Sequence, residues 1–178
     1  MTLFTERSIW TMIHGIVLGG SALLAFSAAL YCMWSVRTAD GNDSAARTRC
    51  GHLARLMLGL TIIVWAMVLI GTYVNFPPYR ATPPEGATDL SAFPRSLLNS
   101  NPETAWLHGF AMEIKEHVPW MIAMLMTAVS FVLLRYHSDL VERPRVRRTI
   151  SAFVTIGFVL TAGVALLGML INKVAPLA

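Results

Sequence analysis

Charged side chains are scarce in this sequence: only 13% of its 178 residues are Asp, Glu, Lys or Arg, whereas 55% are hydrophobic. Because about a quarter of the residues in soluble domains are charged, this composition excludes an ordinary soluble domain. Cysteine is also scarce, with two residues and no Cys-x-x-Cys-His motif, which excludes covalently attached c-type haem. The sequence also lacks phosphate-loop, zinc-protease and nucleophile-elbow motifs. These absences leave a membrane protein without the usual motifs of an enzyme.

Four long apolar runs account for most of the chain. They cover approximately Ile9–Val36, Leu53–Val74, Val118–Leu134 and Ile150–Asn172. A helix needs about 20 residues to cross a hydrocarbon core of about 30 Å. The runs therefore predict an all-α integral membrane protein, an antiparallel four-helix bundle that forms a single domain over residues 1–178. Between the second and third spans, residues 75–117 are expected to form a proline-rich loop and a helical lead-in.

Basic residues gather in two short connections, the loop between the first and second spans and the loop between the third and fourth. Nine of the fourteen lie there: Arg37, Arg47, Arg49, Arg55, Arg135, Arg143, Arg145, Arg147 and Arg148. The positive-inside rule places these connections in the cytoplasm, so both termini and the long loop face outward, to the periplasm if the membrane is the bacterial inner membrane. The basic residues indicate contact with lipid headgroups of the bilayer and no role for nucleic acid. Because the first run is longer than a signal-peptide core and follows Glu6, we expect it to be retained.

The third helix has a clear start signal and one interruption. Asn101-Pro102-Glu103 combines an N-cap residue, a proline at the first helical position and an acidic first turn. The helical pattern continues to about Tyr136, with Pro119 inside it. Either one long kinked helix spans this segment, or a new span begins near Pro119. The long proline-rich loop before it either docks a partner or simply covers the mouth of the bundle.

Three histidines lie at the outer end of the predicted bundle, namely His14, His108 and His117. An ionisable side chain at membrane depth is costly, so a functional site is the first hypothesis. At 1.5 Å per residue, His14 lies about 34 Å from Arg37, while His117 lies about 27 Å and His108 about 40 Å from Arg135. We favour His14 and His117 as the axial ligands of a haem iron. Glu113, one turn before His117 on the same face, would fix the tautomer of His117.

Several alternatives to this pair remain open. His108 lies on the opposite face of the third helix, together with Lys115. Trp106-x-His108-Gly109 echoes Trp10-x-x-x-His14-Gly15, which is either a chance match, the reading we favour, or a sign of two related hairpins in which His14 and His108 are equivalent ligands. Met112 or Met121 are further candidate axial ligands. The small residues on the face of His14 suit close helix packing or a flat cofactor; they are Ser21, Ala25, Ala28 and Cys32. The histidines also suit plain solvation at the membrane interface.

The chain resembles small four-helix bacterial membrane subunits akin to b-type cytochrome anchors. The resemblance rests on Trp10-x-x-x-His14-Gly15, on the run Trp106-Leu107-His108-Gly109-Phe110-Ala111-Met112-Glu113-Ile114-Lys115-Glu116-His117, and on the stretch from Gly71-Thr72-Tyr73 to Pro94-Arg95. It implies a haem clasped by one histidine from each of two spans, a role that His14 matches with His117 or His108.

The functional expectation follows from this resemblance. We expect an integral subunit of a respiratory or photosynthetic electron-transfer complex that holds haem b near the outer surface and contacts other membrane subunits and an outer-side cytochrome c or iron–sulfur subunit. It would be an electron carrier or anchor, not a self-contained enzyme. One alternative is a cofactor-free accessory subunit. The other is a quinol-handling subunit in which His117, Glu113 or Glu116 accepts protons.

Overall fold

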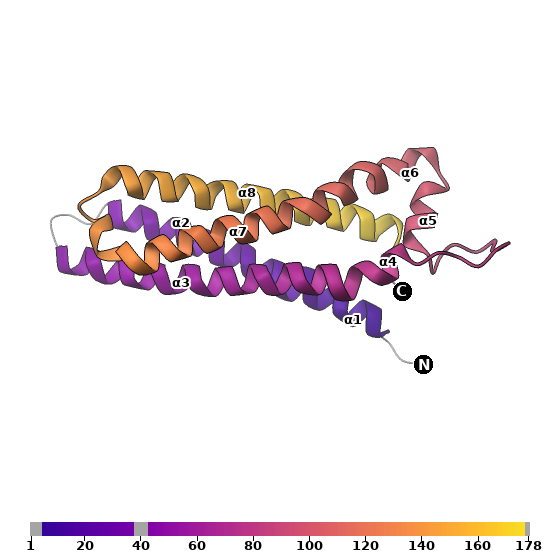
Figure 1. Cartoon of the computed structure of the whole chain (residues 1–178), viewed down its shortest axis with the longest axis horizontal. Helices are drawn as coiled ribbons and strands as arrows, with labels where there is room; N and C mark the ends of the chain where they lie inside the picture. The colour runs from indigo at the N-terminus through magenta and orange to yellow at the C-terminus, as the bar shows by residue number, and fades with distance from the viewer. Residues whose placement is uncertain (1–4, 38–42, 177–178) are drawn as a thin grey trace.

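The computed structural model describes residues 5–37 and 43–176 and contains four long helical runs that lie side by side (Figure 1). Each run is long and apolar enough to cross a membrane; they cover Glu6–Val36, Ser44–Arg80, Pro102–Leu140 and Pro144–Val174. The predicted all-α architecture with four candidate spans is therefore confirmed. The runs extend beyond the apolar segments of the sequence, because the flanking residues continue the helices.

Three of the four runs contain a π-helical turn. The first consists of α1 (Glu6–Met12), η1 (Ile13–Gly19, π-helical) and α2 (Gly20–Arg37). The second consists of α3 (Asp43–Ile70), η2 (Gly71–Asn75, π-helical) and α4 (Phe76–Arg80). After α5 (Pro94–Asn99), the third consists of α6 (Pro102–Trp106), η3 (Leu107–Met112, π-helical), α7 (Glu113–Tyr136) and the 3-10 turn η4 (His137–Leu140). The fourth run is α8 (Pro144–Val174).

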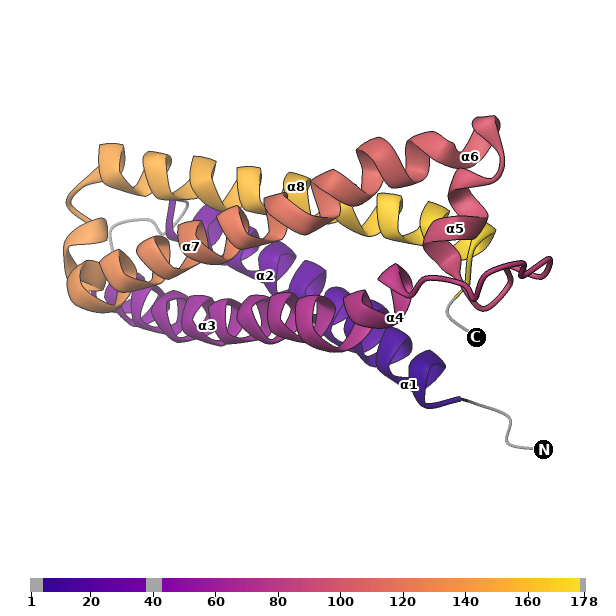
Figure 2. The ribbon, with the colours of Figure 1, turned by 45° about the vertical axis from the view of Figure 1, so that its right-hand side comes forward.

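The two ends of the bundle differ. At one end, which we call the arginine end, lie the end of α2, the starts of α3 and α8, and the end of α7 with η4 (Figure 1). The opposite end, which we call the cap end, carries both described chain ends together with α4, α5, α6 and the loop between α4 and α5 (Figure 2). Most arginines predicted in connecting loops lie within helices instead, such as Arg47 in α3 and Arg148 in α8. Arginine has a high helix propensity and can extend its charged group toward water.

The start of the third run is confirmed. The side chain of Asn101 accepts a hydrogen bond from the backbone N–H of Glu103 at 2.9 Å, as an N-cap residue does. Helix α7 continues through Pro119, so no new span begins there. Of the two alternatives, the single long helix is the one observed. Its irregularity lies earlier, in the π-helical turn η3, between α6 and α7.

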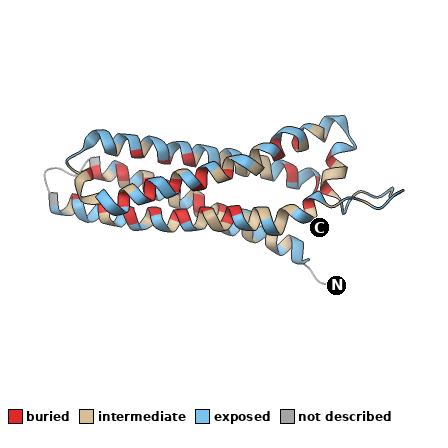
Figure 3. Cartoon of the chain, viewed as in Figure 1, coloured by how far each residue is buried: buried red, intermediate tan, exposed pale blue. Residues whose placement is uncertain are grey.

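The core lies where α2, α3, α7 and α8 face one another, and the outward sides are exposed (Figure 3). The first run buries a stripe of apolar residues: Ala22, Phe26, Ala29, Met33 and Val36. This stripe is shifted by one residue from the predicted face of Ser21, Ala25, Ala28 and Cys32. The π-helical turn η1 precedes it, and because such a turn holds more residues than an α-helical turn, it rotates the following face.

A small polar network joins α3 to α7 inside this core. The buried hydroxyls of Thr61 and Ser130 lie 2.7 Å apart. Both also reach the carbonyl oxygen of Met57, at 2.8 and 2.9 Å, and Thr61 lies 3.1 Å from the carbonyl oxygen of Met126. The hydroxyls are thereby satisfied without water, which is the requirement for polar groups inside a membrane bundle.

Removing this network should weaken the α3–α7 contact measurably. Because interhelical hydrogen bonds in membrane bundles contribute about 0.6 kcal/mol on average and up to about 1.7, we expect Thr61→Val to lower the free energy of unfolding by about 1 kcal/mol. Equilibrium unfolding in mixed micelles measures it. Thr155→Val is the matched control, since exposed Thr155 bonds only to Ser151 of its own helix. An equal loss in both variants would contradict an interhelical role.

The cap end has its own apolar core. Residues of α4, α5 and η3 pack there against the last turns of α8: Tyr79, Leu98, Leu107, Ala111, Met112 and Ile171 are all buried. The short helices α4 and α5 are therefore fixed to the end of the fourth helix. This packing holds Tyr79 and η3 in defined positions.

Candidate functional site

All three π-helical turns lie in the cap half of the bundle, and two of them carry candidate histidines. His14 lies in η1 and His108 in η3, while Gly71 begins η2. The two short motifs that end in His14-Gly15 and His108-Gly109 therefore share this irregular backbone. π-helical turns are rare and are frequently found at functional sites. Their presence in three neighbouring runs therefore makes the cap half of the bundle the first place to look for a functional site.

The imidazole of His14 faces the interior and lies against the second run. A Cβ atom built on Gly71 would lie 2.8 Å from Cε1 of His14, so the ring occupies the space that a side chain at position 71 would need. His14 also interacts with the backbone carbonyl of Met67. Its Nδ1 atom is buried and has no hydrogen-bond partner. A buried polar atom without a hydrogen-bond partner destabilises the folded state. The Nδ1 atom of His14 is therefore a candidate for binding a ligand or a partner.

Lys115 is the second interior group, and it comes from α7. Its Nζ lies 3.2 Å from the position that a Cβ atom would take on Gly168 of α8. Its ammonium interacts electrostatically with His14. Among residues 5–37 and 43–176, no acidic side chain forms an ion pair with Lys115. An imidazole from the first run and an amine from the third thus lie inside the cap half of the bundle, and within the described residues Lys115 has no ion-pair partner.

His117 and Glu113 lie on the outward side of α7. The His117 side chain is 71% exposed, its Nδ1 donates a hydrogen bond to the carbonyl oxygen of Glu113 at 2.8 Å, and it lies 3.7 Å from the Glu113 carboxylate. Met124 and Phe131, further along the same helix face, are exposed as well. This face points away from the core, so the structure does not bring His117 and His14 to opposite sides of one site.

His108 belongs to the cap and not to the interior pair. Its Nδ1 is hydrogen-bonded to the hydroxyl of Tyr79 at 2.9 Å, and the two rings lie 6.0 Å apart. Glu116 and Arg95 both interact electrostatically with this pair. Tyr79 also stacks on Phe76, with ring centroids 6.0 Å apart. The bond to Tyr79 ties His108 to α4 and leaves only its Nε2 free for other partners.

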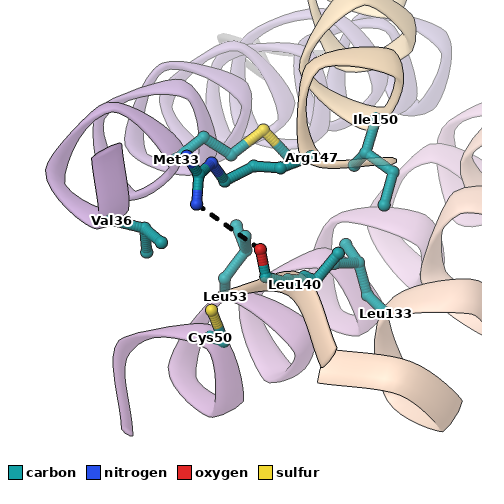
Figure 4. A pocket seen from close by; sticks show the side chains of 8 residues that line it. All are labelled: Met33, Val36, Cys50, Leu53, Leu133, Leu140, Arg147 and Ile150. Atoms are coloured by element: carbon teal, nitrogen blue, oxygen red, sulfur yellow. Dashed lines mark hydrogen bonds between the residues drawn. The ribbon is translucent and has the colours of Figure 1, made fainter. Parts of the chain in front are cut away.

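Two hollows in the described part of the chain are candidates for holding a ligand or a partner. The cap end has an open hollow of about 440 Å³, lined by Ala81, Thr82, Arg95, Ser96, Asn99 and Ser100. At the arginine end, a cavity of about 10 Å³ lies among apolar side chains beside Cys50 and Arg147 (Figure 4). Arg147 reaches across it to the carbonyl oxygen of Leu140 at 3.4 Å. That cavity holds at most one water molecule, so of these two hollows the one at the cap end has room for a ligand or a partner.

Within the described ranges, no group of three or more His, Cys, Asp or Glu residues could hold a metal ion. Comparisons with protein-family models, with curated proteins and with solved structures found no match. The functional argument therefore rests on the site itself.

Sequence reasoning identified His14 but missed its neighbours. It placed Lys115 on the face opposite His117, which is correct, yet took the His117 face as the one of interest. Gly71 and Gly168 carried no signal, because a glycine in an apolar span is compatible with many contacts. The available signal was Lys115 itself, the one lysine within the predicted spans or the helical lead-in to them.

Proposed function

We propose that this chain is an integral membrane subunit of an electron-transfer complex and that it engages a redox carrier in the cap half of the bundle. The observation that carries this proposal is the interior pair of His14 and Lys115. Polar ionisable groups inside a membrane bundle are costly and mark functional sites by default. Among residues 5–37 and 43–176, neither group forms an ion pair, and Nδ1 of His14 has no hydrogen-bond partner.

Haem b was the carrier favoured by the sequence, and the residues present fit it only in part. His14 offers an imidazole nitrogen without a partner, which suits an axial ligand, and Lys115 offers a cation for a propionate. The second ligand does not fit, because His117 faces outward and His108 is bonded to Tyr79. The ring of His14 also lies directly against Gly71. A haem clasped between His14 and His117 therefore does not fit this bundle, and we derive no step through it.

A quinol or quinone is the second candidate, and Lys115 favours it. An amine that donates hydrogen bonds, and an imidazole with an unpartnered nitrogen, suit an oxygen-bearing ring that enters from the lipid. This candidate keeps the proposed electron-transfer role but moves the site from His117, Glu113 and Glu116 to the interior pair.

The positive-inside rule supports placing the arginine end in the cytoplasm, so that the cap end faces outward. For a bacterial protein this side is the periplasm. The open hollow beside Arg95 and the proline-rich segment would then be accessible to an outer-side cytochrome c or iron–sulfur subunit. The chain would pass electrons within such an assembly together with its partner subunits.

Affinity purification of the tagged full chain from its native membranes, in a mild detergent, tests the proposed role. We expect subunits that carry haem or iron–sulfur clusters to co-purify. Reduced-minus-oxidised spectra of the wild type, His14→Ala and His117→Ala then address haem directly. If this chain ligates haem b, the signal disappears in His14→Ala and remains in His117→Ala. A wild-type preparation without haem, iron–sulfur cluster or quinone would overturn the proposal.

A further inference from the structure

We propose that Arg55 of α3 and Arg135 of α7 bind the phosphate of an anionic phospholipid whose acyl chains lie along the exposed apolar side chains of the same two helices. Both residues are exposed, and we call them the arginine pair. The site lies at the arginine end and does not depend on the proposed electron-transfer role. The observations behind it are the register of α3 against α7, the ion pairs of the neighbouring arginines and the apolar residues that lead away from the pair.

The register of α3 against α7 places the two arginines at nearly the same height. The indole Nε1 of Trp65 donates a hydrogen bond to the hydroxyl of Thr127 at 2.9 Å. Closer to the arginine end, a Cβ atom built on Gly51 would lie 3.9 Å from Cδ2 of His137. Both members of the arginine pair lie between these two contacts, on antiparallel helices that rise about 1.5 Å per residue. They therefore lie within about one helical turn of each other along the bundle.

Each arginine ends a row of side chains on the outward surface. The members of each row are exposed or half-buried: Trp65, Ile62, Leu58 and Arg55 on α3, and Thr127, Phe131 and Arg135 on α7. Residues that follow one another at intervals of three or four share one face of a helix. The hydrogen bond between Trp65 and Thr127 joins the two rows. Because the helices are antiparallel, both rows then continue along the same outward side and end together at the arginine pair.

The charge of the arginine pair is available to a ligand, because nearby carboxylates pair with other arginines. Glu142 lies 2.7 Å from Arg47, and Asp139 lies 3.6 Å from Arg143. Within the described residues, neither member of the arginine pair forms an ion pair. An arginine side chain can donate two parallel hydrogen bonds to the oxygens of a phosphate. Two such side chains on neighbouring helices therefore favour an anionic phosphate group.

The apolar members of the two rows favour a lipid over a free phosphate. Leu58, Ile62 and Phe131 are 41%, 61% and 66% exposed, and they lead from the arginine pair toward the middle of the bundle. Arg135 directly follows the apolar run that ends at residue 134, so the pair lies at the hydrocarbon boundary. A phosphate held there leaves the acyl chains against these apolar side chains, whereas a free phosphate would contact the arginines alone.

Native mass spectrometry of the full chain, released from nanodiscs of phosphatidylcholine and phosphatidylglycerol, tests the proposal. We expect the wild type to retain phosphatidylglycerol in excess of its share of the disc lipid. Arg55→Gln and Arg135→Gln should each lower the ratio of retained phosphatidylglycerol to phosphatidylcholine about fivefold. Arg145→Gln and Arg148→Gln are the matched controls, because they remove the same charge from exposed positions of α8 at the same end of the bundle. Their ratio should stay within about twofold of the wild type.

Cross-linking of the wild-type chain keeps the test valid if the variants do not fold. Phosphatidylglycerol with a photoreactive diazirine in its acyl chain should label residues 58–65 and 127–134. An excess of inorganic phosphate should not reduce this labelling, because free phosphate makes no apolar contact. Equal losses in all four variants would overturn the proposal, since they would indicate a general attraction to the arginine end. Labels confined to other helices, or labels lost on addition of inorganic phosphate, would also overturn it.

Discussion

Gly71→Ala should disable the candidate site without unfolding the bundle. The new methyl group would lie 2.8 Å from Cε1 of His14, well inside van der Waals contact, so the imidazole must move. His14 is a side chain with rotatable bonds, and its displacement costs less than a shift of packed helices. We expect binding of the redox carrier to weaken about tenfold, which corresponds to about 1.4 kcal/mol. The midpoint of thermal unfolding should change by only a few degrees.

Gly59→Ala is the matched control for this variant. Gly59 lies on α3 in the same run, and a Cβ atom built there meets no neighbour within 4 Å. Carrier content per purified chain, measured by haem spectra and by extraction of quinone, gives the comparison. The interpretation of His14 fails if Gly71→Ala retains full carrier content, or if Gly59→Ala loses as much.

Gly157→Val should cause the largest loss of stability. A Cβ atom at position 157 would lie 3.0 Å from Cε of Met126 and 3.0 Å from Cε1 of Phe26. Both neighbours are fully buried and belong to α7 and α2, so the larger valine side chain must displace these two side chains or push α8 away from them. Overpacking of a tight core typically costs about 1–3 kcal/mol. We expect a loss of this size in the free energy of unfolding.

Gly163→Val is the control that separates the effect of lost packing on the free energy of unfolding from the effect of the changed helix propensity. Gly163 is exposed on α8, and a side chain there enters open space. Equilibrium unfolding of Gly157→Val and Gly163→Val should therefore show a large loss only for the first. Similar values for the two variants would mean that α8 does not pack against Phe26 and Met126 as described.

The four long helices were predictable because their signal is strong and local. Runs of about 20 apolar residues have few alternatives to a membrane helix, and Asn101-Pro102-Glu103 specifies a helix start by its own chemistry. The lengths of the helices were less predictable, since arginines such as Arg47 and Arg148 were assigned to connections although they continue α3 and α8. Hydropathy detects the membrane-spanning part of a helix and not its polar ends.

The candidate site was only partly predictable, because it depends on backbone irregularities. A helical wheel at 100° per residue holds for an α-helix, but η1 and η3 insert wider turns beside His14 and His108. The face that the wheel gave to His14 includes Ala25 and Cys32, which are partly buried, whereas the fully buried stripe of the first helix lies one position further along the chain. In the third helix it grouped Glu113 and His117 correctly, yet it cannot say which face is buried. That choice depends on contacts with α3 and α8, which place Lys115 inward.

Photolabelling with an azido-quinone tests the central claim most directly, namely that His14 and Lys115 mark the place where this chain engages a redox carrier. The full chain, with its co-purified partners, would be labelled in native membranes and mapped by mass spectrometry of its peptides. The account predicts labels within residues 11–17 and 112–119, reduced by an excess of unmodified quinone. Labels confined to the arginine end, or to the outward face around Phe131, would contradict it.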